Sequence, residues 1–161
     1  MTIEVIQADY RNVRQAKEIV MLLNAYASDA MGGGRPLARE VLDNLADELA
    51  RLPYAFSVIA YADSRPAGLA NCFEMFSTFL CRPLINIHDM VVLPEFRGRG
   101  ISRRMLEKIE EIAVQKGCCK LTLEVLSGNQ AARSAYQNFG FTNYELDPAH
   151  GQALFWQKLL E

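Results

Sequence analysis

The chain lacks the features that mark membrane proteins, secreted proteins and nucleic-acid-binding proteins. None of its apolar runs approaches the roughly 20 residues that a membrane-spanning helix needs, and its polar, acidic start does not resemble a secretory signal. The formal net charge is −2, so the chain has no excess of positive charge for nucleic acid or for an anionic membrane. We therefore expect a cytoplasmic protein with neither a nucleic-acid partner nor a membrane partner.

Cysteine is sparse, and its spacing does not fit a metal site. The four cysteines are Cys72, Cys81, Cys118 and Cys119, and no two of them have the Cys-x-x-Cys spacing of common zinc sites. The adjacent Cys118 and Cys119 are poor disulfide partners for each other. We expect free thiols in a reducing compartment and no bound metal. Internal repeats and low-complexity segments are also absent from the sequence.

What the chain does contain is the composition of an ordinary globular domain. Half of its 161 residues are hydrophobic and 22% are charged, which allows one domain, residues 1–161, to bury a core. Apolar alternation predicts strands, and apolar residues at helical spacing predict helices. The predicted strands are residues 3–7, 55–61, 69–80, 85–93, 120–125 and 153–159, and the predicted helices are residues 11–28, 36–52, 131–139 and a long one from 101. By itself this pattern establishes a single α/β domain.

The most informative segment is the loop between the strand 85–93 and the helix that begins near Ile101. Residues 93–100 read Leu-Pro-Glu-Phe-Arg-Gly-Arg-Gly; the proline ends the strand, and Gly98 and Gly100 let the backbone approach a bound group closely. The first amides of a helix lack partners inside it and carry the positive end of the helix dipole. We expect this loop to hold a phosphate or pyrophosphate. A glycine-stiffened turn with solvated arginines is the simpler alternative.

Two common phosphate-binding patterns do not fit this loop. A dinucleotide fingerprint requires a third glycine three residues after Gly100, and that position is Arg103. A nucleoside-triphosphate loop requires Gly-Lys-Ser/Thr, which the sequence does not contain. The triple glycine at 32–34 lacks the same continuation, so we expect it to form a flexible loop.

The pattern that remains is Arg-x-x-Gly-x-Ser, residues 97–102. It resembles the coenzyme A loop of the GNAT superfamily of N-acetyltransferases, Gln/Arg-x-x-Gly-x-Gly/Ala, although Ser102 stands where glycine or alanine is usual. The superfamily's companion motif, Asn-x-x-Ala-x-x-x-Tyr-x-x-x-Gly-Phe, matches in the C-terminal third. Its matching residues are Asn129, Ala132, Tyr136, Gly140 and Phe141. Two motifs in this order make the resemblance specific, and it spans at least residues 54–147.

The resemblance implies a mixed, mostly antiparallel central sheet with helices on both faces, in the order β-αα-βββ-α-β-α-ββ. It implies an N-acetyltransferase in which a primary amine, of a small molecule or of a protein or peptide, attacks acetyl-CoA directly. A catalytically silent acyl-CoA-binding or regulatory module on the same fold is the alternative, and a homodimer is open. The residues that the resemblance assigns to coenzyme A are Met90, Val91, Val92, Arg97, Gly98, Arg99, Gly100, Ile101, Ser102, Arg103 and Asn129.

Two residues are candidates for proton transfer in such a reaction. His88 lies in the strand before the loop, where several family members carry a histidine or glutamate that handles the amine proton. An imidazole titrates near neutrality and suits this task, and simple packing in the strand is the alternative. Tyr136 matches the tyrosine that family members use on the coenzyme A sulfur. A phenol is protonated at neutrality and can donate; packing of a helix is its alternative.

The acceptor site is harder to read from the sequence. Four residues are candidates for binding the acceptor: Tyr26, Asp29, Glu74 and Asp89. Acidic groups beside aromatic rings suit a cationic amine, such as a polyamine, an amino acid, an aminoglycoside or a protein terminus, and solvated surface is the alternative. Strand alternation places Asp89 on the face opposite to His88 unless the strand bulges. The base is therefore open among His88, Asp89, Glu74 and bulk water.

Overall fold

The structure is a computed structural model that describes residues 1–160. Its main elements follow the order β1, α1, α2, β2, β3, β4, α3, β5 and α4. The chain divides into two compact units, Met1–Leu123 and Glu124–Glu161. The first unit holds the sheet and three helices, and the second holds α4. Within residues 1–160, no helix is both long enough and apolar enough to cross a membrane.

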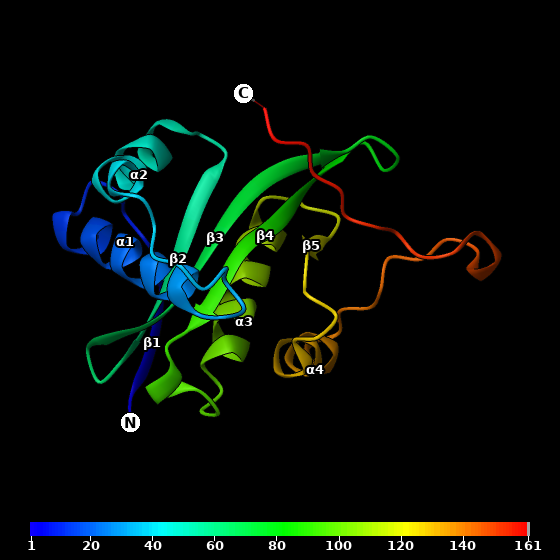
Figure 1. Cartoon of the computed structure of the whole chain (residues 1–161). Coiled ribbons are helices and arrows are strands. Elements are labelled where there is room, and N and C mark those ends of the chain that lie inside the picture. Colours follow the sequence, from blue (N-terminus) through cyan, green and yellow to red (C-terminus); the bar gives the residue numbers. More distant parts are fainter. Residues whose placement is uncertain (161) are drawn as a thin grey trace. The chain divides into compact units, whose positions relative to one another are not determined.

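Five strands of the first unit form one sheet in the order β1-β2-β3-β4-β5, so neighbours in the chain are neighbours in the sheet (Figure 1). The first four strands are antiparallel, and β5 runs parallel to β4. The strands are β1 Ile3–Gln7, β2 Ala55–Ala62, β3 Arg65–Ser77, β4 Arg82–Val92 and β5 Leu121–Leu123. The helices of this unit are α1 Val13–Ser28, α2 Arg39–Arg51 and α3 Ile101–Gln115.

Helices cover both faces of this sheet, as the resemblance implied. On one face α1 and α2 share a core cluster with the sheet. That cluster comprises Ile19, Leu22, Leu49, Ile59, Tyr61, Leu69 and Val91. On the other face α3 lies so close to β3 that a Cβ at Gly68 would meet the Met105 sulfur at 2.9 Å. The face under α1 and α2 is called the α1/α2 face below.

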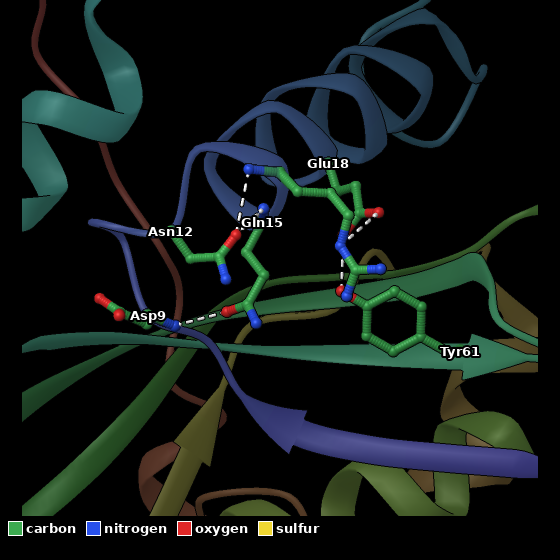
Figure 2. Close-up of polar contacts among 6 residues, drawn as sticks. Asp9, Asn12, Gln15, Glu18 and Tyr61 are labelled. Atoms are coloured by element: carbon green, nitrogen blue, oxygen red, sulfur yellow. Dashed lines mark hydrogen bonds and ion pairs between the residues drawn. The ribbon is translucent and has the colours of Figure 1, made fainter.

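α1 is fixed at its N-terminal end by its own cap and by a contact with β2 (Figure 2). The Asn12 side chain accepts from two backbone N–H groups of the first turn at 3.1 and 3.3 Å, as asparagine commonly does before a helix. The Gln15 side chain accepts from the backbone N–H of Asp9 at 2.7 Å. The Tyr61 hydroxyl of β2 donates to Glu18, and burial followed by this carboxylate raises the pKa of Tyr61 to about 12. These contacts hold α1 against the sheet.

β4 carries a bulge at His88. Asn71 of β3 pairs with Asp89, and the next β3 residue, Cys72, pairs with Ile87, so His88 has no residue opposite it on β3. A bulge of this kind places two residues of one strand against one of its partner and interrupts the alternation of side chains between the two faces. This irregularity decides where the candidate site residues of β4 point.

The second unit contains α4, Gln130–Phe139, and one 3-10 turn at Pro148–His150. The Asn129 side chain accepts from the backbone N–H of Ala132 at 3.2 Å and caps the helix. Gly140 ends it with a φ of 112°, in the left-handed region that glycine adopts most easily. The predicted helix is therefore confirmed.

Some predicted bounds differ from the structure, and one predicted strand does not form. β3 spans Arg65–Ser77 where residues 69–80 were predicted. The second helix begins at Arg39 and not at Pro36, because the backbone of Leu37 donates to the Asn24 side chain of α1 at 2.9 Å and Ala38 is extended. Residues 153–159 are not a strand, and residues 151–160 form no regular element. A strand needs a neighbour to pair its backbone groups, and the described part of the second unit contains no strand.

The four cysteines are free thiols, as their spacing predicted. Cys72 is buried in β3, where burial raises the pKa of its thiol and the charge of Asp89 raises it further. Burial also raises the pKa of the Cys118 thiol. A thiol is nucleophilic as its thiolate, so these two environments do not favour cysteine chemistry at neutral pH.

Candidate active site

The loop before α3 has the geometry of an anion site. Gly98 and Gly100 have φ angles of 73° and 77°, and a Cβ at either position would meet nothing within 4 Å. No side chain among the described residues caps α3, and the first backbone bond of the helix runs from Arg104 to the Gly100 carbonyl at 3.2 Å. The amides of the first helical turn therefore point out of the helix at the positive end of its dipole. An open approach to such amides suits a phosphate group.

The arginines of this segment are engaged elsewhere. Arg97 donates through Nη2 to Asp29 and through Nε to the Val92 carbonyl, each at 2.9 Å. Arg103 pairs with Glu107, one turn further along α3, at 3.0 Å, and Arg99 lies against the Met1 sulfur. The Ile101 side chain is buried, so this residue offers its amide alone. The loop presents backbone N–H groups more directly than guanidinium groups.

One edge of β4 is unpaired where the resemblance requires it. The pairing with β5 runs from Ile85 to Ile87, and no strand of residues 1–160 pairs with the rest of β4 on that side. Met90 and Val91 lie in this unpaired stretch and can offer backbone groups to an extended ligand. Val92 lies there too, but its carbonyl already accepts from Arg97.

The bulge brings His88 and Asp89 to the same face of the sheet. The His88 and Phe73 rings form a T-shaped pair with centroids 5.5 Å apart, and the Asp89 carboxylate accepts from the Asn71 amide at 3.0 Å. Asn71 and Phe73 are two residues apart on β3 and share a face, and Phe73 packs against the core under α1 and α2. The prediction that Asp89 faces away from His88 was therefore wrong, because alternation fails at the bulge.

Tyr26 and Asp29 come from the end of α1 on this same face. Burial raises the pKa of Tyr26, and the charges of Asp89 and then Asp29 raise it further. Asp29 follows the last residue of α1, where the hydrogen bond from Arg97, and then the one from the Met31 N–H, lower its pKa. Tyr26 and Asp89 thus belong to one electrostatic environment, whereas the charge of Asp29 is compensated by Arg97.

Glu74 does not join this group. It follows Phe73 on β3 and so faces the α3 side of the sheet, where it accepts from Lys116 at 2.9 Å just beyond the end of α3. Of the four acceptor candidates, the structure brings Tyr26, Asp29 and Asp89 to the α1/α2 face and places Glu74 on the opposite side.

Three residues of this face escaped the reasoning from sequence. The Asn71 side chain donates a hydrogen bond to Asp89, and Ser57 of β2 donates one to Asn71. The hydroxyl of Tyr10, which follows β1, forms a hydrogen bond with the Ser57 hydroxyl. The signal that would have found two of them is a lone polar residue inside an apolar strand. Ser57 and Asn71 interrupt the runs Ala-Phe-Ser-Val-Ile and Leu-Ala-Asn-Cys-Phe, and a buried polar side chain requires a partner.

The remaining two candidates, Tyr136 and Asn129, belong to the second unit. Tyr136 lies on α4, and its ring forms a T-shaped pair with that of Phe141, with centroids 5.9 Å apart. Asn129 caps α4 through its side chain, so a role in the helix is enough to explain this residue. The role of each toward coenzyme A stays a prediction.

Comparison with known proteins agrees with both motifs. A sequence profile described as the acetyltransferase (GNAT) family matches residues 16–141. Thialysine N-epsilon-acetyltransferase of Bos taurus is 30% identical over 142 residues, which cover 80% of this chain and 82% of that protein. The residues that the family profile matches include both the loop before α3 and α4.

Solved structures show the same fold. An aminoglycoside acetyltransferase from an uncultured soil metagenomic sample, meta-AAC0020 in complex with sisomicin, has a TM-score of 0.79 at 12% identity, over 99% of this chain and 97% of that one. AAC(6')-Iy in complex with the bisubstrate analog CoA-S-monomethyl-acetylneamine has a TM-score of 0.77 at 18% identity, over 99% of this chain and 100% of that one. At these identities the likeness concerns the fold.

Proposed function

This chain belongs to the acetyltransferase (GNAT) family of acetyl-transferring enzymes, and on that premise we propose that it transfers the acetyl group of acetyl-CoA to a primary amine of a small molecule by direct attack. The observation that carries the proposal lies in the first unit. There the bulged strand that turns His88 and Asp89 to one face leads directly into the uncapped start of α3. Amine acetylation needs a proton acceptor for the amine and an anion site for the phosphates of coenzyme A, and one continuous segment offers both.

The residues of the loop before α3 fit acetyl-CoA, the acetyl donor. The amides of residues 98–103 would hold the pyrophosphate of coenzyme A, and the unpaired edge of β4 at Met90 and Val91 would pair with its extended arm. When bound, acetyl-CoA supplies an acetyl group activated as a thioester. Asn129 is proposed as a further contact, on the strength of the companion motif alone.

His88 is the proposed acceptor of the amine proton. An alkylammonium is not nucleophilic until it loses a proton, and an imidazole can take that proton directly or through a water. His88 is exposed and its ring forms a T-shaped pair with Phe73, so it is accessible to an acceptor while its orientation is restrained. Tyr136 is proposed, from the motif, to donate a proton to the departing sulfur.

The acceptor we propose is a small cationic amine in the cytoplasm. Asp89 and Tyr26 form an acidic and aromatic environment beside His88, and such an environment attracts ammonium groups. The names of the relatives point the same way, since thialysine and aminoglycosides both carry primary amines.

The experiment is a panel of amines incubated with acetyl-CoA and the purified chain, in which released thiol is measured and acetylated product is identified by mass. The panel holds thialysine, lysine, 1,3-diaminopropane, an aminoglycoside and a short peptide with a free N-terminus. We expect at least one small amine to be acetylated faster than the peptide. Thiol release no faster than hydrolysis without amine would contradict the proposal and would favour a silent coenzyme A-binding module.

A further inference from the structure

A chain of hydrogen bonds runs across the α1/α2 face and ends at Asp89. The Tyr10 hydroxyl contacts the Ser57 Oγ at 2.9 Å, Ser57 donates to the Asn71 Oδ1 at 2.7 Å, and the Asn71 Nδ2 donates to the Asp89 Oδ2 at 3.0 Å. Ser57 and Asn71 are 0% and 3% exposed. A residue that follows β1 and one residue from each of β2, β3 and β4 are therefore joined by hydrogen bonds on this face of the sheet.

The direction of every hydrogen bond in this series follows from Asp89, at which the series ends. A carboxylate accepts only, so the Asn71 amide must turn its Nδ2 toward Asp89 and its Oδ1 toward Ser57. Ser57 has a single hydroxyl proton and gives it to Asn71, so the Tyr10 hydroxyl must donate to Ser57. Burial, as the largest influence, raises the pKa of Tyr10, which keeps this phenol protonated as a donor. All three donors thus point toward Asp89.

Asp89 itself is left with unused acceptor capacity. No other hydrogen bond or ion pair reaches its carboxylate from residues 1–160. The contrast with Asp29 is direct, because Asp29 already holds the Arg97 guanidinium at 2.9 Å. Asp89 is therefore an oriented carboxylate that has no cationic partner within the described part of the chain.

We propose that Asn71, supported by Ser57 and Tyr10, is a positioning residue that fixes the Asp89 carboxylate as the anchor for a positive charge on the acceptor. This inference rests on the proposed function. The nitrogen that attacks must be neutral, whereas a group anchored by Asp89 must keep its charge. The acceptor class is therefore an amine that carries a second cationic group, as in a diamine.

The test compares the kcat/KM values for 1,3-diaminopropane and 3-amino-1-propanol, which differ by one ammonium group. The ratio of the two values is insensitive to partial loss of folded enzyme, because such a loss lowers both apparent kcat/KM values by the same factor. We expect wild type to prefer the diamine by about tenfold or more, as an oriented charge pair allows. Asn71→Ala, Ser57→Ala and Asp89→Asn should lower this preference severalfold, and Ser57→Thr, which keeps the hydroxyl, should retain it.

Asn86→Ala is the matched control. Asn86 is also a buried asparagine of this sheet, at 7% exposure, but its amide donates to Thr122 at 3.1 Å and not to Asp89. It should lose stability as Asn71→Ala does and keep the preference for the diamine. A wild-type ratio near one, an unchanged ratio in Asn71→Ala, or an equal loss in Asn86→Ala would overturn the inference.

A failure of the proposed function can be told apart from a failure of this inference. If no amine is acetylated, calorimetric titration of 1,3-diaminopropane into wild type and Asn71→Ala decides the inference alone. Binding that weakens severalfold in Asn71→Ala supports it. Absence of binding to wild type, or equal binding to both proteins, overturns it.

Discussion

The guanidinium of Arg97 donates to the carboxylate of Asp29 at 2.9 Å and ties the end of α1 to the loop before α3. The same guanidinium donates to the Val92 carbonyl at the end of β4, also at 2.9 Å. One side chain thereby connects the end of α1 to the end of β4 and to the loop that follows it. It holds the glycine loop against the strand and the helix that carry the acceptor-site residues.

The contribution of Asp29 to stability should depend on pH. The hydrogen bond from Arg97, and then that from the Met31 N–H, lower the pKa of Asp29 from its ordinary value of 3.8. A group whose folded pKa is the lower one adds stability above the unfolded pKa and loses it as pH falls through the folded pKa. We expect Asp29→Asn to be less stable than wild type at neutral pH, by at most about 1 kcal/mol for so exposed a pair.

Urea unfolding at a series of pH values measures this difference, which should shrink steadily below about pH 4. Asp43→Asn is the control, because its ion pair with Arg39 lies within α2 and is well exposed. An Asp29→Asn difference that stays constant or grows toward acid pH would contradict the assignment.

The glycine loop makes a prediction about coenzyme A. Gly100→Val places a branched side chain where the ligand's phosphates would approach, so we expect the affinity for coenzyme A to fall at least about tenfold, or 1.4 kcal/mol. Gly117→Val is a matched control, because Gly117 has a φ of 69° and the same open surroundings but follows the far end of α3. Both variants should lose a similar amount of folding stability, about 1–2 kcal/mol, because valine is strained in the left-handed backbone conformation. Calorimetric titration with coenzyme A separates them, and equal affinities in the two variants would remove the argument for a pyrophosphate site.

Tyr136 can be tested by removing one oxygen. Tyr136→Phe keeps the ring that meets Phe141 and loses the proton that we propose is given to the leaving sulfur. The turnover number should fall by about 10²–10⁴, as for loss of a general acid, while the affinity for coenzyme A stays nearly constant. Tyr144→Phe, an exposed tyrosine of the same unit, is the control. Normal turnover in Tyr136→Phe would assign this residue to packing.

His88 should control the acidic side of the pH–rate profile. A base must be unprotonated to act, so turnover should fall as the pH is lowered, and in His88→Ala this limb should give way to one at higher pH that follows the ionisation of the amine. The variant should be slow at neutral pH and partly recover in alkaline buffer, where more of the amine arrives deprotonated. His88→Gln should not restore activity, because an amide cannot take the proton.

The chain's other histidine provides the control for this series, and His150→Gln should behave as wild type. Turnover is followed from pH 6 to 10 or so with the amine that the panel identifies. If the acidic limb is unaltered in both His88 variants, His88 is a packing residue and the proton goes to Asp89 or to water.

The local features of this protein were readable from its sequence. Residues 3–7 form a strand as predicted, Asn129 and Gly140 bound α4, and the two glycines before α3 adopt left-handed φ angles. These outcomes depend on capping, on backbone freedom and on apolar periodicity, which act within a few residues. The two motifs that carried the resemblance are local in the same sense, and the family followed from them.

Tertiary structure alone decided how the candidate site residues are combined. Pairing between β3 and β4 creates the bulge that sets Asp89 beside His88, and the same pairing puts Glu74 with Lys116 on the other face. Arg97 is drawn to Asp29, 68 positions away, and not toward the loop it belongs to. Strand register and ion pairing between distant segments depend on which strands pair and in which alignment. A shift of one residue in register would move every side chain of a strand to the opposite face of the sheet. The sequence by itself therefore determined the elements and the chemistry they offer, while the pairing of the strands decided which side chains share one face.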